Sequence, residues 1–518
     1  MESLDEHRSR GLSPRNRGVL PNQRQLASAA TFTILFSRKS FDASSSSFIF
    51  SVMIQFDYDV AVIGGGSGGY AAARTAASAG LRTVVLEGGD EVGGLCILRG
   101  CMPTKALLYA AEVIHLARHA GTWGVHTQNV SFDFSQVMAR KNAMIKNFAD
   151  DRRQQLADGP FKFIRALARF TDPHTLSLSH GETISAGHFI ISTGSVVATP
   201  PLPRLKEIGC LTSDEALRLA QPPKSLIVLG GGAVAVEFAQ FFARFDVKVT
   251  LVQRSPHILR DFDTDAATEL EKVFRREGIT IFTCSKLNDA WRNAKLKGIT
   301  FEHEGKIVRV AAEEILFALG RVPNTASLNL GNAGVVTEHS RIVTNEQMQT
   351  STPHIYAAGD CTSAHEIVHI AIQQGEVAAH NIAHPDQPRS LDYRLLTRVV
   401  FTDPQMGCVG LTEKEATIRN IPFVSASYPF NEHGKSLIME ALDGFVKLLA
   451  NPNTGEIVGG CCVGPMGGEL IHEIIAAMNQ RMTVHELAAL PHYHPTLAEI
   501  WTYPAEELAT KIRQPPVT

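Results

Sequence analysis

The sequence lacks a long apolar run and is poor in cysteine for its length. In 518 residues, no stretch reaches the roughly 18 to 20 consecutive apolar residues that a membrane-spanning helix needs. Eight cysteines are too few for a secreted disulfide scaffold and are typical of a reducing compartment with a few special thiols. Neither sign of charge predominates, because 49 basic residues stand against 52 acidic ones. The sequence therefore predicts no membrane and no nucleic acid as a partner, and a soluble chain of two or three domains.

The first 52 residues differ in composition from the rest of the chain. They contain seven basic residues against four acidic ones, and residues 44–47 are all serine. This composition is typical of a transit peptide, but it also suits a disordered extension or sequence upstream of a start at Met53. We favour the second interpretation, because a strand pattern begins directly afterwards. We exclude residues 1–53 from the predicted fold and expect a cytoplasmic protein, with organellar targeting by residues 1–52 left open.

One design of strand, glycine-rich turn and helix begins at residue 58. Tyr58–Ile63 is predicted as a buried strand of a parallel sheet. Residues 64–69 then form the turn, and residues 70–79 an alanine-rich helix. A second strand, Thr83–Leu86, ends on Glu87. This order is typical of a nucleotide-binding βαβ unit.

The same design returns later in the chain. Ser225–Leu229 is the strand, residues 230–235 are the turn and residues 236–244 the helix. Residues 247–252 form the second strand, which ends at Gln253. In both copies, 23 residues separate the first glycine of the turn from the residue that ends the second strand. Two such units at one spacing are much more specific than a single glycine-rich turn, so the sequence predicts dinucleotide binding.

The first turn has the residues that a pyrophosphate site requires. Gly64, Gly66 and Gly69 would let the backbone approach the phosphates, at the positive end of the following helix. Glu87 is predicted to accept hydrogen bonds from a ribose. The alternative for Glu87 is a solvated acid at the end of a strand.

The second turn differs at the residue that should face the ribose. Its small residues are Gly230, Gly232 and Ala235. Where the first copy has an acid, the second has the neutral Gln253, with Arg254 and Arg260 close behind. A carboxylate would repel a ribose 2′-phosphate, whereas two arginines would bind it through charge-assisted hydrogen bonds. The sequence therefore favours NADP(H) over NAD(H), although solvated surface arginines are the alternative.

Later segments show how the domains alternate. Residues 189–195 are predicted as a strand ending in a small-residue turn, and residues 200–203 as a crossing between domains. Residues 315–321 resemble the first of these segments and should close the second domain. Residues 355–360 should then return to the first domain. From about residue 391 the pattern changes to strands around a turn, followed by a helix.

These patterns predict an α/β fold. It should contain two Rossmann-like nucleotide-binding domains and a C-terminal α+β domain. The first domain is expected to be discontinuous, over residues 54–203 and 325–392. The second should cover residues 204–324 and the third residues 393–518.

Two cysteines lie five residues apart in the segment 96–105. On a regular helix, Cys96 and Cys101 would be separated by about 7.5 Å of rise, whereas a disulfide needs Cα atoms about 4.4 to 6.8 Å apart. If these cysteines form a disulfide, the start of the helix is distorted, and strain makes the bond easier to reduce. Two independent thiols or a metal pair are the alternatives. No further metal ligands stand nearby at a suitable spacing, so no metal is predicted.

Near the other end of the chain, His494 is followed five residues later by Glu499. Histidine changes charge near neutral pH, so it can move the proton that thiol–disulfide exchange requires. The carboxylate would select its tautomer. On these residues alone, a functional and a structural role for His494 are equally supported.

Taken together, residues 54–510 resemble the FAD-dependent pyridine nucleotide–disulfide oxidoreductases. This family includes dihydrolipoyl dehydrogenase, glutathione reductase and mercuric reductase. Residues 96–105 are similar to its redox-active segment, and residues 357–360 to its second FAD motif. Residues 401–404 resemble the start of its dimerisation domain. His494, followed by Pro-Thr and then by Glu499, is similar to its histidine–glutamate pair.

The resemblance implies FAD in addition to a nicotinamide nucleotide. We expect the FAD to be bound non-covalently, because the sequence has no evident motif for covalent flavin attachment. It assigns Thr193, Gly194 and Asp360 to the FAD site, together with the first glycine-rich turn. It assigns Gly320 to the NAD(P) site. The C-terminal domain is then a dimerisation domain, and the protein a homodimer.

The resemblance also implies an order of electron transfer. NAD(P)H would reduce the flavin, and the flavin would reduce the disulfide through Cys101. Cys96 would then exchange with the substrate, assisted by His494 of the other subunit. Lys105 and Glu237 look like the family's ion pair beside the flavin, where a fixed positive charge favours reduced flavin.

Some residues depart from the family pattern. Leu95 and Leu98 replace the usual threonine and asparagine around Cys96, which makes the segment more apolar and leaves the substrate in doubt. Gln253 is unlike the acid of most dihydrolipoyl dehydrogenases, whereas His369 resembles the lipoamide branch. The vicinal pair Cys461-Cys462 is predicted as buried small residues rather than a metal relay. The remaining cysteines are predicted as structural thiols: Cys210, Cys284, Cys361 and Cys408.

The leading prediction is an oxidoreductase acting on a sulfur group with NAD(P), mechanistically like dihydrolipoyl dehydrogenase. Its substrate would be a small disulfide or dithiol, or a lipoyl domain. One alternative is a mercuric ion reductase, but the C-terminal tail has no cysteine pair. A second alternative, of another class, is a non-catalytic flavoprotein that senses redox state.

Overall fold

The computed structural model describes residues 55–362 and 365–512. The predictions for residues 1–53 fall outside this part of the chain. In the described part, no helix combines the length and the apolar character needed to cross a membrane.

The first glycine-rich turn belongs to a seven-stranded sheet. Its parallel strands lie in the order β3, β2, β1, β6 and β18, and β5 and β4 extend β6 as an antiparallel ribbon. The strands are β1 (Tyr58–Ile63), β2 (Thr83–Leu86), β3 (Lys162–Ile164), β4 (Ala168–Asp172), β5 (Thr175–Leu178), β6 (Thr183–Ile191) and β18 (Ile355–Ala357). The pairing of β18 with β6 shows that the chain returns to this sheet late in the sequence, as expected.

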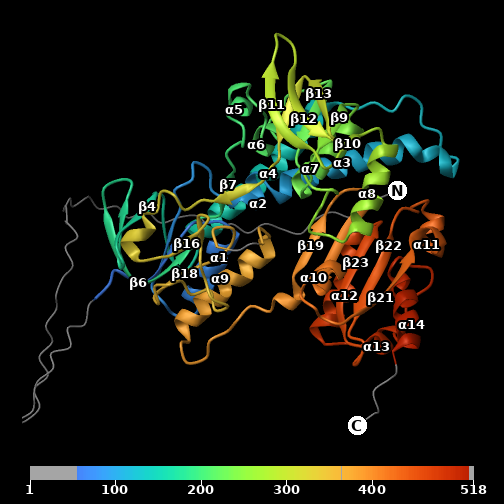
Figure 1. The fold of residues 1–518 in the computed structure, drawn as a ribbon. Coiled ribbons are helices and arrows are strands. Elements are labelled where there is room, and N and C mark those ends of the chain that lie inside the picture. The colour runs from blue at the N-terminus through green and yellow to red at the C-terminus, as the bar shows by residue number, and fades with distance from the viewer. Residues whose placement is uncertain (1–54, 363–364, 513–518) are drawn as a thin grey trace, which may run out of the picture. The chain divides into compact units, whose positions relative to one another are not determined.

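Two helices far apart in sequence, α1 (Ser67–Ser78) and α9 (Val368–Ala383), pack side by side against this sheet (Figure 1). Glycines permit the close approach. A Cβ on Gly375 would stand 2.3 Å from the carbonyl oxygen of Gly68, and a Cβ on Gly68 would stand 2.8 Å from that of Ala371. No larger residue fits at this crossing.

The second turn belongs to a four-stranded parallel sheet in the order β10, β9, β8, β14. The strands are β8 (Ser225–Leu229), β9 (Lys248–Val252), β10 (Thr280–Phe282) and β14 (Glu314–Phe317). Helix α7 (Ala233–Arg244) follows the turn, and α8 (Thr264–Arg276) follows β9. A separate antiparallel sheet is formed by β11 (Lys286–Arg292), β12 (Lys297–His303) and β13 (Lys306–Ala312). Two short strands, β7 (Ser195–Val197) and β15 (Arg321–Pro323), pair where the chain leaves the first sheet and later returns.

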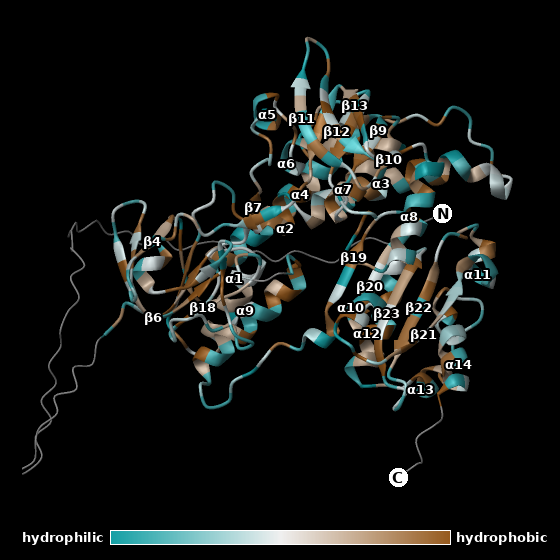
Figure 2. Ribbon diagram, viewed as in Figure 1, coloured by the Kyte–Doolittle hydropathy of each residue, from teal (hydrophilic) through white to brown (hydrophobic). Residues whose placement is uncertain are grey.

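The C-terminal part is a five-stranded antiparallel sheet in the order β19, β20, β23, β22, β21. Its strands are β19 (Thr397–Val400), β20 (Gln405–Gly410), β21 (Val424–Pro429), β22 (Phe445–Ala450) and β23 (Ile457–Gly464). Helices α12 (Gly467–Asn479) and α14 (Thr502–Lys511) pack on it, and buried apolar residues of the sheet and of both helices form one cluster. Strands β22 and β23 are largely hydrophobic (Figure 2). The predicted α/β class with two Rossmann-like units and a C-terminal α+β unit is confirmed.

The main difference from the expected elements is where the turn helices begin. Helix α1 begins at Ser67 and α7 at Ala233, three residues before the predicted starts. Gly66 and Gly232 are extended residues at the N-cap, so the last residues of each turn already belong to the helix. Their free backbone N–H groups therefore stand directly at the turn, which is the arrangement a phosphate group needs.

Candidate functional site

Cys96 and Cys101 lie on two separate helices. Cys96 is in α2 (Gly94–Leu98), and Cys101 is the first residue of α3 (Cys101–His119). The sequence predicted a distorted helix start only for bonded cysteines, whereas the structure breaks the helix at Arg99 and Gly100 with both thiols free. A Cβ on Gly100 would stand 3.3 Å from the Cα of Cys96 and 3.0 Å from the carbonyl oxygen of Leu95, so glycine permits this approach. Both cysteines are half-buried free thiols.

The two thiols are electrostatically unequal. A hydrogen bond from the Cys96 thiol lowers the pKa of Cys101 to about 7, against the opposing effect of burial. The positive charge of Lys105 acts in the same direction, and so does the start of a helix. The same hydrogen bond, with burial, raises the pKa of Cys96. Above pH about 7 the pair therefore holds one proton, and that proton is on Cys96.

Lys105 and Glu237 form an ion pair, as the resemblance implied. The Lys105 Nζ lies 2.8 Å from Oε2 and 3.0 Å from Oε1 of Glu237, whose side chain is buried in α7. Glu237 Oε1 also accepts a hydrogen bond from the backbone N–H of Phe401, at 3.0 Å. The Lys105 Nζ stands 4.6 Å from the centre of the Phe401 ring. One ion pair thus connects the redox segment to α7 and to the segment after β19.

Glu87, the acid at the predicted ribose position, accepts hydrogen bonds from the first turn and from the residues that follow β2. The Gly65 N–H donates to Oε2 of Glu87 at 2.9 Å, and the Gly89 N–H donates to Oε1 at 2.7 Å. Gly64 has a φ of +109°, and a Cβ on Gly69 would stand 1.9 Å from its carbonyl oxygen. Glu87 therefore holds the shape of the turn in addition to lying at the predicted ribose position.

Thr193, Gly194 and Asp360 come to the same edge of the sheet as this turn. They follow β6 and β18, which are parallel to β1, so the carboxyl ends of all three strands meet there. The Ser195 hydroxyl donates to Oδ2 of Asp360 at 2.8 Å. The Thr193 hydroxyl is buried and has no hydrogen-bond partner within the described residues. A phosphate or ribityl oxygen would satisfy it.

Arg152 is a cation at this turn that the sequence analysis missed. It lies on α4 (Phe134–Ala157), and its guanidinium carbon stands 4.3 Å from the centre of the Tyr70 ring, in the start of α1. Its Nε and Nη1 are buried and have no hydrogen-bond partner in the described part of the chain. The same helix places Leu156 3.3 Å from the position of a Cβ on Gly65. An unpaired cation beside a helix N-terminus fits an anionic pyrophosphate, so these residues fit FAD.

The second turn repeats the geometry of the first with a neutral residue. A Cβ on Gly231 would stand 2.9 Å from Nε2 of Gln253, as one on Gly65 would stand 3.1 Å from Oε2 of Glu87. A Cβ on Gly230 would stand 2.3 Å from the carbonyl oxygen of Ala318, which brings the turn against the strand that leads to Gly320.

The two predicted phosphate-binding arginines are exposed. Among the residues described, no ion pair or hydrogen bond reaches the Arg254 guanidinium. Arg260 Nε stands 3.6 Å from Asp261, and its side chain is 64% exposed. Its carbonyl oxygen accepts a hydrogen bond from Lys414 Nζ at 3.0 Å, which anchors this loop to the C-terminal part.

His494 and Glu499 are paired, but not beside the cysteines of their own chain. His494 Nδ1 lies 2.9 Å from Oε2 and 3.1 Å from Oε1 of Glu499. The imidazole is 78% exposed, whereas the carboxylate is nearly buried. Over residues 55–362 and 365–512, no hydrogen bond or electrostatic interaction joins His494 to Cys96 or Cys101. An exposed, oriented imidazole of this kind is available to a second chain.

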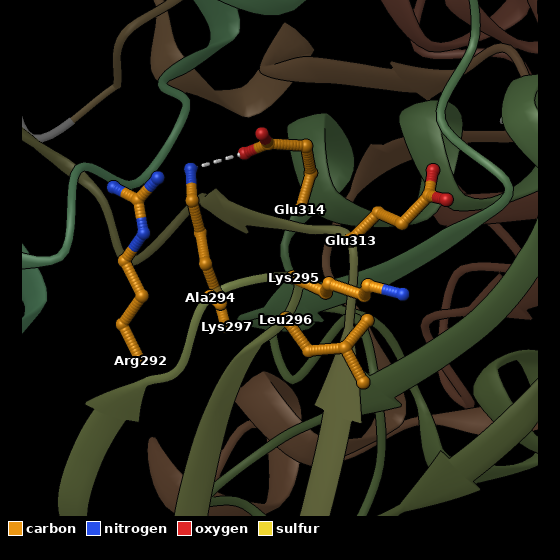
Figure 3. A pocket seen from close by; sticks show the side chains of 7 residues that line it. All are labelled: Arg292, Ala294, Lys295, Leu296, Lys297, Glu313 and Glu314. Carbon is orange, nitrogen blue, oxygen red and sulfur yellow. Dashed lines mark hydrogen bonds and ion pairs between the residues drawn. The ribbon is translucent and has the colours of Figure 1, made fainter.

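Of the remaining cysteines, Cys361 lies beside the candidate FAD residues, because it is buried directly after Asp360 and next to Thr193. Cys461 and Cys462 are buried in β23, and Cys461 faces Cys408 of β20. A hollow of about 390 Å³ opens at the turn between β11 and β12, where Lys297 Nζ points at Glu314, 2.5 Å away (Figure 3). No predicted site residue lines it, and we assign it no part in the chemistry.

Comparison with known families agrees with this geometry. The family described as pyridine nucleotide-disulphide oxidoreductase matches residues 58–375, and the dimerisation domain of that family matches residues 396–505. The chain belongs to this family. It is therefore a flavoprotein oxidoreductase that uses FAD, and its dimerisation domain supports a homodimer.

Named relatives include both branches that the sequence suggested. The chain is 34% identical to the dihydrolipoyl dehydrogenase of Bacillus subtilis over 457 residues, which covers 86% of this chain and 96% of that protein. It is 32% identical to a mercuric reductase of Staphylococcus aureus over 445 residues, covering 86% and 81%. The predicted family and its dihydrolipoyl dehydrogenase-like activity type are confirmed.

Solved structures show the same fold. LpdA from Mycobacterium tuberculosis superposes with a TM-score of 0.78 at 27% identity, over 87% of this chain and 99% of that one. The HOCl-induced flavoprotein disulfide reductase RclA from Escherichia coli gives 0.77 at 26% identity, with the same coverage.

Proposed function

We propose that this protein is an NADP(H)-preferring, FAD-dependent reductase of a small disulfide, working as a homodimer through Cys96 and Cys101. The observation that carries the proposal is the unequal pair of thiols. One proton shared between them leaves Cys101 as the thiolate and Cys96 as the thiol. The family resemblance makes Cys96 the cysteine that exchanges with the substrate, once His494 has removed its proton. Such a pair is suited to two-electron thiol–disulfide chemistry.

The exchange balances as follows. His494 of the partner subunit takes the proton of Cys96 on Nε2. The Cys96 thiolate attacks one sulfur of the substrate disulfide, and the other sulfur leaves as a thiolate that takes this proton from His494. The Cys101 thiolate then attacks Cys96 and forms the Cys96–Cys101 disulfide, which releases the second substrate sulfur as a thiolate that is protonated by water. FAD, when bound, supplies the two-electron exchange between NADPH and this disulfide. Glu499 holds His494 in the tautomer with the proton on Nδ1, so that Nε2 can move protons.

The FAD-binding residues in this proposal surround the first turn. Backbone N–H groups at Gly66 and the start of α1 would hold the pyrophosphate, together with the guanidinium of Arg152, whose Nε and Nη1 have no hydrogen-bond partner among the described residues. Glu87 would hold the ribose, and Asp360 and Thr193 the groups nearer the flavin. Lys105, paired with Glu237, would put a fixed positive charge beside the flavin.

The preference for NADPH rests on the second turn. Gln253 carries no charge to repel a 2′-phosphate, and the Arg254 guanidinium has no partner in the residues that the structure describes. An arginine–phosphate hydrogen bond contributes about 1.5 to 3 kcal/mol, so one good contact should favour NADPH by about tenfold or more. Gly320 and Ala235 would leave room for the nucleotide.

The name of the dihydrolipoyl dehydrogenase relatives suggests a lipoyl group as one form of the disulfide. We also propose the domain limits 54–203 with 325–392, 204–324 and 393–518, because β7 and β15 pair at the two crossings between the first and second units. The free thiols suit a cytoplasmic location.

Steady-state assays of the purified dimer test the proposal. NADPH and NADH should each be offered with lipoamide, glutathione disulfide and mercuric ion. Turnover of a disulfide, with NADPH favoured by about tenfold in kcat/KM, is the expected result. Turnover of mercuric ion alone would contradict the disulfide assignment, and the absence of any turnover would indicate a redox sensor.

A double variant tests the preference for NADPH over NADH. Gln253→Glu combined with Arg254→Ala should reverse the preference, because repulsion replaces attraction at the 2′-phosphate. Arg169→Ala removes an exposed arginine on β4 and should leave the nucleotide preference unchanged. Equal use of both nucleotides by the unmodified enzyme at low salt would refute the assignment.

A further inference from the structure

Glu499 lies between two imidazoles. One is His494, whose Nδ1 is 2.9 Å from Oε2. The other is His433, whose Nε2 is 3.3 Å from Oε1 of the same carboxylate. The two histidines differ in exposure, because His494 is 78% exposed and His433 is fully buried. A Cβ on Gly434 would stand 4.0 Å from Cε1 of His494, so the chain after His433 also runs beside the exposed ring.

His433 is a neutral imidazole. Burial lowers its pKa below the ordinary value of histidine, although Glu499 acts in the opposite direction. Apart from Glu499 and His494, the groups that surround it carry no charge: the rings of Phe430 and Tyr503 approach it edge-on. At neutral pH the ring therefore has one N–H, and the position of that proton decides what the ring does.

The neighbours of His433 select the tautomer. Its Nδ1 lies 2.8 Å from the hydroxyl of Ser436, which can donate to it. Its Nε2 is buried, and in the described residues it has no partner with full hydrogen-bond geometry, so Oε1 of Glu499 is the acceptor within reach. With the proton on Nδ1 instead, a lone pair on Nε2 would face a buried carboxylate oxygen. The tautomer with the proton on Nε2 avoids this repulsion.

We propose that His433 is a positioning residue, which donates from Nε2 to Glu499 and holds that carboxylate against Nδ1 of His494. The proposal rests on the proposed role of His494 in thiol exchange. A second donor has two consequences. It restricts rotation of the carboxylate, and it takes part of the negative charge that would otherwise act on His494 alone.

Two substitutions separate this role from simple packing. His433→Leu fills the space but has no donor, so the full carboxylate charge acts on His494 and favours its protonated form. The midpoint of the pH–rate profile of the dithiol half-reaction should then rise by about one pH unit. In His433→Gln the side-chain amide can put an N–H near the place of Nε2, so the midpoint should stay near that of the unmodified enzyme.

The experiment is stopped-flow kinetics on FAD-loaded dimers, with the two half-reactions followed separately over a pH series. We expect His433→Leu to shift only the dithiol half-reaction, with normal reduction by NADPH. Midpoints equal to the unmodified enzyme in both variants, or shifted equally in both, would refute the proposal.

If His433→Leu does not fold, Ser436→Ala replaces it. Without the Ser436 hydroxyl, His433 can also carry its proton on Nδ1, so it donates to Glu499 for only part of the time. The midpoint of the pH–rate profile should therefore shift in the same direction by a smaller amount. An unshifted profile would refute the proposal. His494→Gln serves as the reference: if it leaves the dithiol half-reaction unchanged, the proposed function itself fails, whereas a slow His494→Gln with an unshifted His433→Leu refutes only the role of His433.

Discussion

Cys101 shows how a single position determines which sulfur of a pair carries charge. It is the first residue of α3, it accepts a hydrogen bond from Cys96, and Lys105 stands one turn further along the same helix. Each of these interactions favours the thiolate, and burial opposes them. Cys96 lies in the short helix α2, its thiol donates to Cys101, and burial favours its neutral form, so it keeps the proton. The difference between the two thiols therefore comes from their positions on α2 and α3 and not from their chemistry.

The pH dependence of the reduced enzyme follows from this difference. The long-wavelength absorbance of a thiolate beside the flavin should be strong above the Cys101 pKa of about 7 and should fade as the pH drops below it, because protonation removes the thiolate. Lys105→Met should move the loss of the band to higher pH, since a positive charge that favours the thiolate is gone. Absorbance spectra over a pH series provide the measurement, and a band that is constant from about pH 5.5 to 8.5 would contradict the assignment.

Arg152 makes a second prediction for a single residue. Arg152→Met should weaken FAD binding by about tenfold or more, because a charge-assisted contact with the pyrophosphate is lost. Titration of the apoprotein with FAD, followed by fluorescence, gives the dissociation constant. The FAD affinity of Arg152→Lys should lie between those of the unmodified protein and Arg152→Met. Arg153→Met, which changes the exposed neighbouring arginine, is the matched control. An unchanged FAD affinity in Arg152→Met would remove Arg152 from the FAD site.

A cluster of charged side chains joins the C-terminal sheet to the start of α8, close to the loop that contains Arg260. Lys447 of β22 is buried, and its Nζ lies 2.8 to 3.0 Å from Asp263, Asp265 and Glu413. Burial alone would lower the pKa of Lys447, but hydrogen bonds to Asp265 and Asp263 outweigh it and raise the pKa. Asp263 also accepts hydrogen bonds from two N–H groups at the start of α10 (Glu413–Ile418). This cluster is close in sequence to Arg260, so it supports the loop that should bind NADPH.

Replacement of the lysine should therefore have two effects. Lys447→Met should lower the free energy of unfolding by about 3 to 5 kcal/mol, because Asp263 is left buried without its counter-charge. It should also raise KM for NADPH more than kcat falls, since the Arg260 loop loses its support. Denaturant unfolding and steady-state kinetics measure the two. Lys272→Met, which removes a lysine of α8 that is 62% exposed, should have a smaller effect on stability, and equal losses would contradict the central place of Lys447.

At the scale of the whole molecule, one chain holds both halves of the chemistry but does not bring them together. The cysteine pair lies at the start of α3, and the His494–Glu499 pair follows α13 (Val484–Ala488), with no interaction between them in the described part of one chain. The match to the dimerisation domain accounts for this arrangement, because a twofold dimer contains two copies of each half.

Mixed dimers test whether a site is built from two chains. Cys101→Ser and His494→Gln dimers should each be nearly inactive toward the disulfide. Random mixing of the two chains should restore about a quarter of the original activity, since half of the dimers then contain one complete site. Activity should not recover when the two mutant homodimers are mixed under conditions in which their subunits do not exchange. No recovery after proven exchange would show that each chain works alone.

The elements that the sequence determined are those that depend on neighbouring residues. The two strand–turn–helix units and the pairing of His494 with Glu499 could be predicted, because each is encoded within a few turns of backbone. The break between Cys96 and Cys101 was expected only with a disulfide, whereas the structure has it with both thiols free. The ion pair of Lys105 with Glu237 was predicted only through the family resemblance, since its partners are far apart along the chain. Even the helix starts were misplaced by three residues, because glycine at an N-cap does not show where the first helical residue stands.

Only the tertiary structure decided which distant side chains meet. His433 lies beside Glu499, Arg152 lies beside the first turn, and Lys447 forms ion pairs with three acids. None of these three residues stands in a distinctive sequence pattern. A lone histidine, arginine or lysine in a helix or strand is ordinary. Its meaning comes from burial, because a charge or an imidazole removed from water must find partners wherever the packing of sheets and helices puts them. That packing depends on the whole chain, so the contacts of these side chains could not be predicted from the residues next to them in the sequence.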